Sequence, residues 1–209
     1  MSNNTFGKSF RLTTFGESHS TCLGGIIEGF PANIKIDYEL LNQELKRRNS
    51  SSAYSTPRIE EDKVIFLSGI ENNISLGTPI AFVIENKNIR KQDYDNLKTT
   101  FRPSHADYTY FCKYGVNASS GGGRASARET VCRVVGGSLA KQFLSSYGIE
   151  INSEITHIGQ FKYSIQRNQA EEALKEAKEK GDSLGGVIKC TINNVPKGLG
   201  EPIFDKLSA

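Results

Sequence analysis

Cysteine is scarce in this 209-residue chain, and tryptophan is absent. The four cysteines lie far apart and form no C-x-x-C pair: Cys22, Cys112, Cys132 and Cys190. This spacing offers no set of metal ligands, and a disulfide framework would be unusual at this chain length. We therefore predict no metal and expect reduced thiols in a cytoplasmic protein.

Long apolar runs and a surplus of one charge are missing as well. No run of about 18 apolar residues occurs, so we expect no membrane-spanning helix. The N-terminal residues lack the apolar region of a secretory signal. The 26 Lys and Arg residues nearly balance the 23 Asp and Glu residues, which gives a net charge of +3. This balance argues against a dedicated nucleic-acid-binding protein, which usually carries a basic excess on one face.

Several common catalytic signatures do not occur. The sequence has no H-E-x-x-H motif, no nucleophile elbow and no pair of histidines with metal-ligand spacing. Its one glycine-rich stretch is not a Walker P-loop, because no Gly-Lys-Ser/Thr follows. The motifs by themselves therefore name no reaction.

The apolar residues that are present fall in patterned blocks. Segments rich in β-branched and aromatic residues predict strands over 9–15, 22–28, 63–68, 79–85, 149–156 and 185–192. Helical spacing predicts helices over 38–48, 126–146 and 169–180. Asp37 and Asn168 are the expected caps of the first and the last helix. This mixed order predicts an α+β fold, which we take as a single domain over residues 1–209.

Two further segments have expected features. Residues 86–104 are charged and aperiodic, which predicts a long loop. Gly136 and Gly137 stand inside the predicted 126–146 helix, where each costs about 1 kcal/mol relative to alanine. This cost suggests that the pair packs closely against a neighbouring element. Gly148 and Gly181 are the expected ends of the two later helices.

The most unusual stretch runs from Ser119 to Thr130 and contains three consecutive glycines. Glycines let the backbone approach a ligand closely, and the predicted helix that follows would direct its first N–H groups at an anion. Arg124 and Arg128 add guanidinium forks that suit phosphate. The stretch therefore predicts an anion-binding site, although a flexible linker before a capped helix has the same pattern.

Two of the three histidines lie in polar turns, His19 in G-E-S-H and His105 in R-P-S-H-A-D. Imidazole titrates near neutrality and can transfer a proton to phosphate. Each is a candidate catalytic group or an ordinary satisfied histidine, while His157 follows a strand pattern and receives no role. The pair Arg47-Arg48 is either a solvated helix end or a second phosphate clamp.

Four ordered stretches together resemble the chorismate synthase family. They read F-G-K-S-F-R-L-T-T-F-G-E-S-H (6–19), R-P-S-H-A-D-Y-T-Y (102–110), K-Y-G (113–115) and G-G-G-R-A-S-A-R-E-T (121–130). The resemblance covers nearly all of residues 5–148. It resumes at 181–207, where G-D-S-L-G-G-V and G-L-G-E-P-I-F-D-K-L look like the family's middle region.

The resemblance implies a reaction and an assembly. Chorismate synthase removes phosphate and a C6 hydrogen from 5-enolpyruvylshikimate 3-phosphate in a 1,4-elimination of the shikimate pathway. It requires reduced FMN, with NADPH as a candidate reductant. The family fold is a β-α-β-α sandwich that assembles as a homotetramer in the cytoplasm, without a nucleic-acid or membrane partner. We expect this chain to hold that fold incompletely, with the C-terminal part of the domain absent.

The resemblance also assigns roles to residues. His19 matches the histidine near the leaving phosphate, and His105 matches the histidine placed against the flavin. Arg48 matches a basic residue for substrate phosphate or NADP, and Arg128 matches a substrate-binding arginine. The FMN-contacting tripeptide matches Arg124, Ala125 and Ser126.

The sequence also departs from the family. Ser20 replaces a glycine, and Ala53 and the stretch from Asn117 to Ser120 replace basic residues. The segment from Tyr163 to Asn168 looks shortened, and the family's C-terminal part is missing. These departures favour an alternative for residues 1–209 taken alone, a non-catalytic remnant that keeps the scaffold and part of the FMN site. For residues 1–209 alone we expect no measurable turnover, and weak FMN binding or none. A generic phosphate- or RNA-binding module is the third hypothesis.

Overall fold

The structure is a computed structural model that describes residues 4–48, 62–87, 100–103, 105–116 and 122–200. It contains two compact units, residues 1–142 and residues 143–209. The expectation of a single domain stays a prediction. The expected loop over 86–104 and the altered positions 53 and 117–120 lie mostly or wholly outside the described residues.

The first unit is built on a five-stranded antiparallel sheet of order β1-β2-β3-β7-β4. Its strands are β1 (Thr5–Phe6), β2 (Arg11–Gly16), β3 (Cys22–Glu28), β7 (Ile80–Glu85) and β4 (Val64–Phe66). A separate two-stranded sheet joins β5 (Ile70–Glu71) and β6 (Ile74–Ser75). The four strands predicted for this unit are confirmed, and their observed bounds are shorter by up to three residues.

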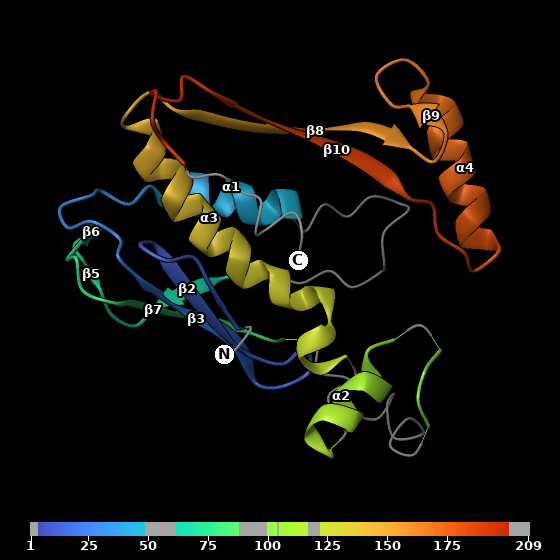
Figure 1. Ribbon diagram of the computed structural model, residues 1–209, viewed down its shortest axis with the longest axis horizontal. Coiled ribbons are helices and arrows are strands. Elements are labelled where there is room, and N and C mark those ends of the chain that lie inside the picture. The colour runs from blue at the N-terminus through green and yellow to red at the C-terminus, as the bar shows by residue number, and fades with distance from the viewer. Residues whose placement is uncertain (1–3, 49–61, 88–99, 104, 117–121, 201–209) are drawn as a thin grey trace. The chain divides into compact units, whose positions relative to one another are not determined.

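One face of this sheet carries the core. Side chains alternate along a strand, and the buried set on β2, β3 and β7 is Leu12, Thr14, Leu23, Ile27, Ile80, Phe82 and Ile84. Two helices, α1 (Tyr38–Arg48) and α3 (Thr130–Ser145), lie against this face (Figure 1). The sheet face and the two helices thus form one apolar layer.

Helix α1 has the start and the apolar stripe that the sequence predicts. The backbone N–H of Leu40 donates to Oδ1 of Asp37 at 2.9 Å, so Asp37 is the N-cap. Leu41 and Leu45 are buried at i and i+4 spacing. The three cations of its last turn, Lys46, Arg47 and Arg48, suit the negative end of the helix dipole.

Helix α3 begins four residues later than predicted. Two short 3₁₀ turns, η2 (Gly123–Ala125) and η3 (Ala127–Glu129), precede it. The cause is Ser126, whose backbone is extended (φ −71°, ψ 140°) and whose Oγ accepts from the N–H of Arg128. The N–H groups of Ala125 and Glu129 also donate within these turns. The glycine loop therefore does not lead directly into the N-terminus of α3, and this part of the predicted anion site is wrong.

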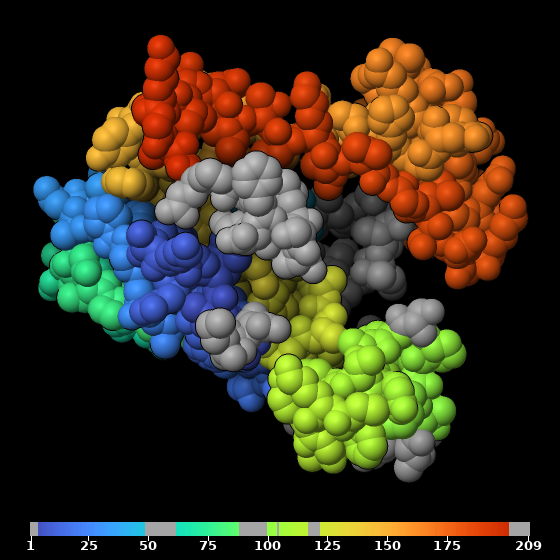
Figure 2. All heavy atoms as spheres, viewed as in Figure 1, coloured from blue at the N-terminus to red at the C-terminus, as the bar shows by residue number. Residues whose placement is uncertain are grey.

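A further helix, α2 (Asp107–Tyr114), follows the predicted loop and was not expected. It ends at Gly115, whose left-handed φ of 70° lets its N–H donate to Phe111. None of its residues is buried, and the space-filling view shows this yellow-green segment at the surface (Figure 2). Helical periodicity is a weak signal here because there is no buried face.

The second unit pairs three antiparallel strands in the order β10-β8-β9. Its elements are β8 (Glu150–Ile158), β9 (Phe161–Lys162), α4 (Arg167–Glu179) and β10 (Gly186–Asn193). Both predicted strands and the predicted helix are confirmed, and Gly181 (φ 68°) follows the end of α4 as expected.

The expected cap of α4 is wrong. Asn168 lies inside the helix, and Gln166 occupies the N-cap position without a side-chain cap bond. Two contacts explain this. The Gln166 side chain accepts from the N–H of Lys162 at 3.1 Å, and Glu171 accepts from Arg167 at 2.7 Å instead of reaching back to a cap.

The four cysteines are free thiols, as predicted. Burial, reinforced by the nearby carboxylate of Glu129, raises the pKa of Cys132 to about 12. That thiol is therefore a packing group rather than a nucleophile. Within the described ranges, no helix has the length and apolar character needed to cross a membrane.

The glycine pair of α3 gives a matched test of packing. A Cβ at Gly136 would stand 3.0 Å from Cδ2 of buried Leu12, whereas a Cβ at Gly137 meets no atom within 4 Å. We predict that Gly137→Ala stabilises the protein by about 1 kcal/mol through helix propensity. Gly136→Ala should stabilise less, because Leu12 must shift. Urea-unfolding midpoints of the two variants check this, and an equal gain would show that α3 does not pack closely here.

Candidate functional site

The turn that carries His19 connects β2 to β3 and is closed by its own polar groups. His19 and Ser18 are buried, with 5% and 2% of their surface exposed. The Ser20 hydroxyl accepts from the N–H of Glu17 at 3.1 Å and lies 2.9 Å from the carbonyl oxygens of Glu17 and Cys22. The serine that replaces the family's glycine thus adds bonds that fix the turn.

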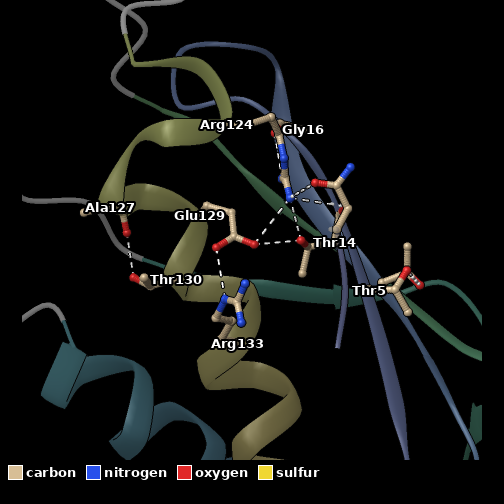
Figure 3. Close-up of polar contacts among 10 residues, drawn as sticks. Thr5, Thr14, Gly16, Arg124, Ala127, Glu129, Thr130 and Arg133 are labelled. Carbon is tan, nitrogen blue, oxygen red and sulfur yellow. Dashed lines mark hydrogen bonds and ion pairs between the residues drawn. The ribbon is translucent and has the colours of Figure 1, made fainter. Parts of the chain in front are cut away.

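The glycine loop is fastened to the end of β2 by Arg124. Its Nη1 donates to the carbonyl of Gly16 at 3.0 Å, and its Nη2 donates to Oγ1 of Thr14 at 2.6 Å (Figure 3). The N–H of Ser18 donates to the carbonyl of Gly123 at 3.4 Å. The glycine loop and the His19 turn are therefore neighbours, joined at the same strand end.

Glu129 completes this contact from the start of α3. Its Oε1 accepts from the Thr14 hydroxyl at 2.7 Å, and its Oε2 accepts from Arg133 at 3.3 Å (Figure 3). Burial alone would raise the pKa of Glu129. The hydrogen bonds from Thr14 and Arg133, with the charge of Arg124, outweigh burial and lower the pKa below its ordinary value.

Arg48 and Arg128 meet on one buried carboxylate. Nε and Nη2 of Arg48 donate to Oδ2 of Asp62 at 3.1 and 2.6 Å. Nη1 of Arg128 donates to the other oxygen, Oδ1. The side chains of Asp62 and Arg128 are only 1% and 5% exposed, while that of Arg48 is 19% exposed. Arg48 is thus no solvated helix end, in contrast to its neighbour Arg47, which is 57% exposed.

Asn86 joins this pair of arginines to the His19 turn. Its Oδ1 accepts from Nε of Arg128 at 3.2 Å. Its Nδ2 donates to the carbonyls of Ser20 and Glu17 at 2.8 and 3.1 Å. A continuous path of hydrogen bonds therefore runs from the His19 turn through Asn86, Arg128 and Asp62 to Arg48.

His105 belongs to a second polar cluster just before α2. Its Nδ1 lies 2.5 Å from Oδ1 of Asp107 and 3.2 Å from Nη2 of Arg102. Arg102 also donates to both carboxylate oxygens of Asp107, at 2.7 and 2.9 Å, and this bond lowers the pKa of that carboxyl. Asp107 and Arg102 both contact the His105 ring at Nδ1, so Nε2 is the ring nitrogen that these two contacts leave open.

The structure thus brings together most of the residues that the sequence singled out. Arg48 and Arg128 share one hydrogen-bonded network that reaches the backbone of the His19 turn through Asn86, and Arg124 with Ser126 borders that turn across the glycine loop. Ala125 is exposed in that loop. The contacts of His105 within the described residues stay in its own cluster. Among those same residues no three His, Cys, Asp or Glu side chains are grouped as metal ligands.

Comparison with known proteins places the chain. The family model for chorismate synthase matches residues 10–209. This chain belongs to the chorismate synthase family. The chorismate synthase of Parabacteroides distasonis is 47% identical over 228 residues, which cover 99% of this chain and 64% of that protein. The chorismate synthase of Christiangramia forsetii is 48% identical, and the match covers 100% of this chain and 65% of that protein.

A solved structure supports the same placement. The crystal structure of a chorismate synthase superposes with a TM-score of 0.73 at 33% identity, over 93% of this chain and 60% of the other. The prediction of an α+β fold of the chorismate synthase type is thereby confirmed. This chain spans less than two thirds of the length of these chorismate synthases.

The sequence did not single out the acceptors that complete the site. Asp62 and Asn86 lie 66 and 42 positions from Arg128, and neither stands in a local motif. Glu129 was inside the quoted glycine-loop stretch but had no assigned part. The only available signal is charge: an arginine that folding buries needs an acceptor.

The stabilising contact that Glu129 makes with Thr14 and Arg133 can be tested through its dependence on pH. Its carboxyl has an ordinary pKa of 4.5 and a lower pKa in the folded protein, so its stabilising effect is complete above about pH 4.5. That effect is lost as the pH falls through the folded-state pKa. We predict that Glu129→Gln lowers the free energy of unfolding at pH 7 by about 1.5–3 kcal/mol, the range for hydrogen bonds to a charged group.

The difference between Glu129→Gln and the parent should shrink as the pH falls toward 3, as measured by urea unfolding at several pH values. Glu28→Gln is the matched control, because Glu28 pairs with Arg11 at the surface, where both side chains are over 40% exposed. That control should change stability by less than about 1 kcal/mol. A Glu129 effect that is independent of pH would show that its charge is not what stabilises the contact.

Proposed function

We propose that the protein acts as a chorismate synthase on 5-enolpyruvylshikimate 3-phosphate. In this reaction the C3–O bond to phosphate breaks, C6 loses a hydrogen, and a second ring double bond forms with no net change of redox state. The observation that carries the proposal is the convergence of Arg48, Arg128 and the His19 turn on one network in a member of this family. Two guanidinium groups that are connected to the turn of a buried histidine suit a phosphate that leaves as an anion.

The charges of the network favour an anionic ligand. Among the described residues, Asp62 is the carboxylate that contacts both guanidinium groups, and one carboxylate balances only one of their two positive charges. Arg48, at 19% exposure, is the more accessible of the two. In this proposal Arg48 and Arg128 bind the substrate phosphate, and His19 supplies a proton to it as it leaves.

The glycine loop fits a flavin contact in part. Both terminal nitrogens of Arg124 are used inside the protein, but its Nε is buried without a hydrogen-bond partner in the described residues. Ser126 Oγ accepts from a backbone N–H, and its hydroxyl proton remains available. These two donors, with exposed Ala125, would hold FMN. Reduced FMN bound there would supply an electron for the loss of phosphate and regain it afterwards, with no net change of redox state.

His105 would act on the flavin side. Asp107 and Arg102 fix the ring of His105 from the Nδ1 side, so Nε2 faces away from the cluster. The family supports three further proposals: NADPH as the reductant, a homotetrameric assembly and a cytoplasmic location.

The reaction itself is tested by incubating the folded chain with reduced FMN and 5-enolpyruvylshikimate 3-phosphate without oxygen and measuring chorismate. Flavin binding is measured separately by fluorescence titration. Chorismate formation supports the proposed function. A folded chain that binds flavin but makes no chorismate supports the non-catalytic alternative.

We predict that His105→Ala lowers turnover by about 10²- to 10⁴-fold, the usual contribution of acid–base assistance. His157→Ala is the matched control, because His157 lies on β8 and contacts Thr156. It should stay within about twofold of the parent. Steady-state rates and circular dichroism of both variants check this. Turnover of the His105 variant near that of the parent would remove His105 from the mechanism.

We predict that Arg48→Ala weakens the binding of the phosphorylated substrate by about 10- to 150-fold, which corresponds to a hydrogen bond to a charged group. FMN affinity should change much less, since Arg48 ends α1 and the flavin contacts lie in the glycine loop. Arg47→Ala, one position away and exposed, is the control. Titration calorimetry with each ligand measures both affinities, and an equal loss for substrate and FMN would contradict separate sites.

A further inference from the structure

Asp62 is the only described carboxylate in contact with both arginines of the proposed phosphate site. Each of its oxygens serves one arginine: Oδ2 accepts from Arg48 and Oδ1 accepts from Arg128. The side chain is 1% exposed, so nearly all of its hydrogen-bonding capacity is directed at these two groups. The carboxylate therefore fixes where both guanidinium groups lie and which edges they present.

The two guanidinium groups would repel each other without this carboxylate. Like charges a few ångströms apart interact strongly when water is excluded, and Arg128 is only 5% exposed. A negative charge between them offsets that repulsion and keeps both forks directed inward. Nη1 of Arg48 has no partner within the described ranges, which leaves donors of this fork for an anion.

Asp62 is poorly suited to leave the arginines when a ligand arrives. A carboxylate that is 1% exposed would then lie in a buried place without a cation, which costs several kcal/mol. Arg128 is also fixed on its other side, because its Nε donates to Asn86. Asp62 is thus a permanent part of the site and does not occupy the place of the phosphate.

We propose that Asp62 is a positioning residue that aligns Arg48 and Arg128 for the substrate phosphate without touching it. This inference rests on the proposed function, in which these two arginines bind that phosphate. It predicts that removing the negative charge weakens anion binding, although the site then carries one more positive charge. Simple electrostatic attraction predicts the opposite sign, so the two explanations separate in one measurement.

The test is a calorimetric titration of the full chain with inorganic phosphate. For Asp62→Asn we expect at least about a tenfold weaker affinity. The matched control is Glu44→Gln, because Glu44 also joins two cations, Lys141 and Arg47, at 2.7 and 2.8 Å. It should stay within about twofold of the parent. Unchanged or tighter phosphate binding by Asp62→Asn overturns the proposal, as does a parent chain that binds no phosphate.

A double-variant cycle separates positioning from a general loss of structure. Because Asp62 acts through Arg48 as well as Arg128, Asp62→Asn should cause a smaller loss of phosphate affinity in an Arg48→Gln background than in the parent. Fully additive losses overturn the proposal. If Asp62→Asn does not fold, Asp62→Glu keeps the charge and displaces it by one methylene. We then expect a several-fold weaker affinity, and parental affinity in that variant overturns the proposal.

The proposed function and the role of Asp62 can be contradicted separately. A chain that shows the expected phosphate pattern but forms no chorismate with reduced FMN supports the role of Asp62 and contradicts the proposed function alone. If the chain forms chorismate while Asp62→Asn binds phosphate like the parent, the proposed function is supported and the role of Asp62 is contradicted.

Discussion

A guanidinium group is costly to remove from water unless acceptors meet its donors, and this requirement organises the first unit. Arg128 is 5% exposed in η3, just before α3, and its partners come from elsewhere in the chain. They come from Asp62, just before β4, and from Asn86, just after β7. Asn86 in turn bonds to the His19 turn between β2 and β3. One buried cation thereby fixes three connections of the sheet relative to the helix.

The arginines of the site differ in how much of their charge is already neutralised. Arg124 gives its terminal nitrogens to Gly16, Thr14 and Glu129, all within the protein. Its positive charge faces the carboxylate of Glu129, and its main effect is to attach the glycine loop to β2. Arg48 and Arg128 share a single carboxylate. Within the described residues this second pair sets two positive charges against one shared carboxylate, which favours an anionic ligand here over the Arg124 contact.

The sequence pattern predicted the elements whose structure is decided by contacts between residues close together in the chain. The Asp37 cap, the Leu41–Leu45 stripe and the alternating core strands all depend on residues within a few positions of one another. Prediction failed where a distant or competing contact decided the outcome. Ser126 capped a 3₁₀ turn and delayed α3, and α2 buries no residue and so leaves no periodic signal. For the site, the donors were visible in the sequence, but Asp62 and Asn86 depend on the folded sheet.

The two candidate histidines are positioned by different physical means. The His19 turn is buried, and Asn86 connects it to the arginines through contacts between residues far apart in sequence. Its geometry therefore requires the whole first unit to be folded. His105 is oriented by Arg102 and Asp107, three and two positions away. That orientation is a property of its own segment and does not depend on a buried face of α2. A disturbance of the sheet should thus displace His19 and the arginines together while the ring of His105 keeps its partners.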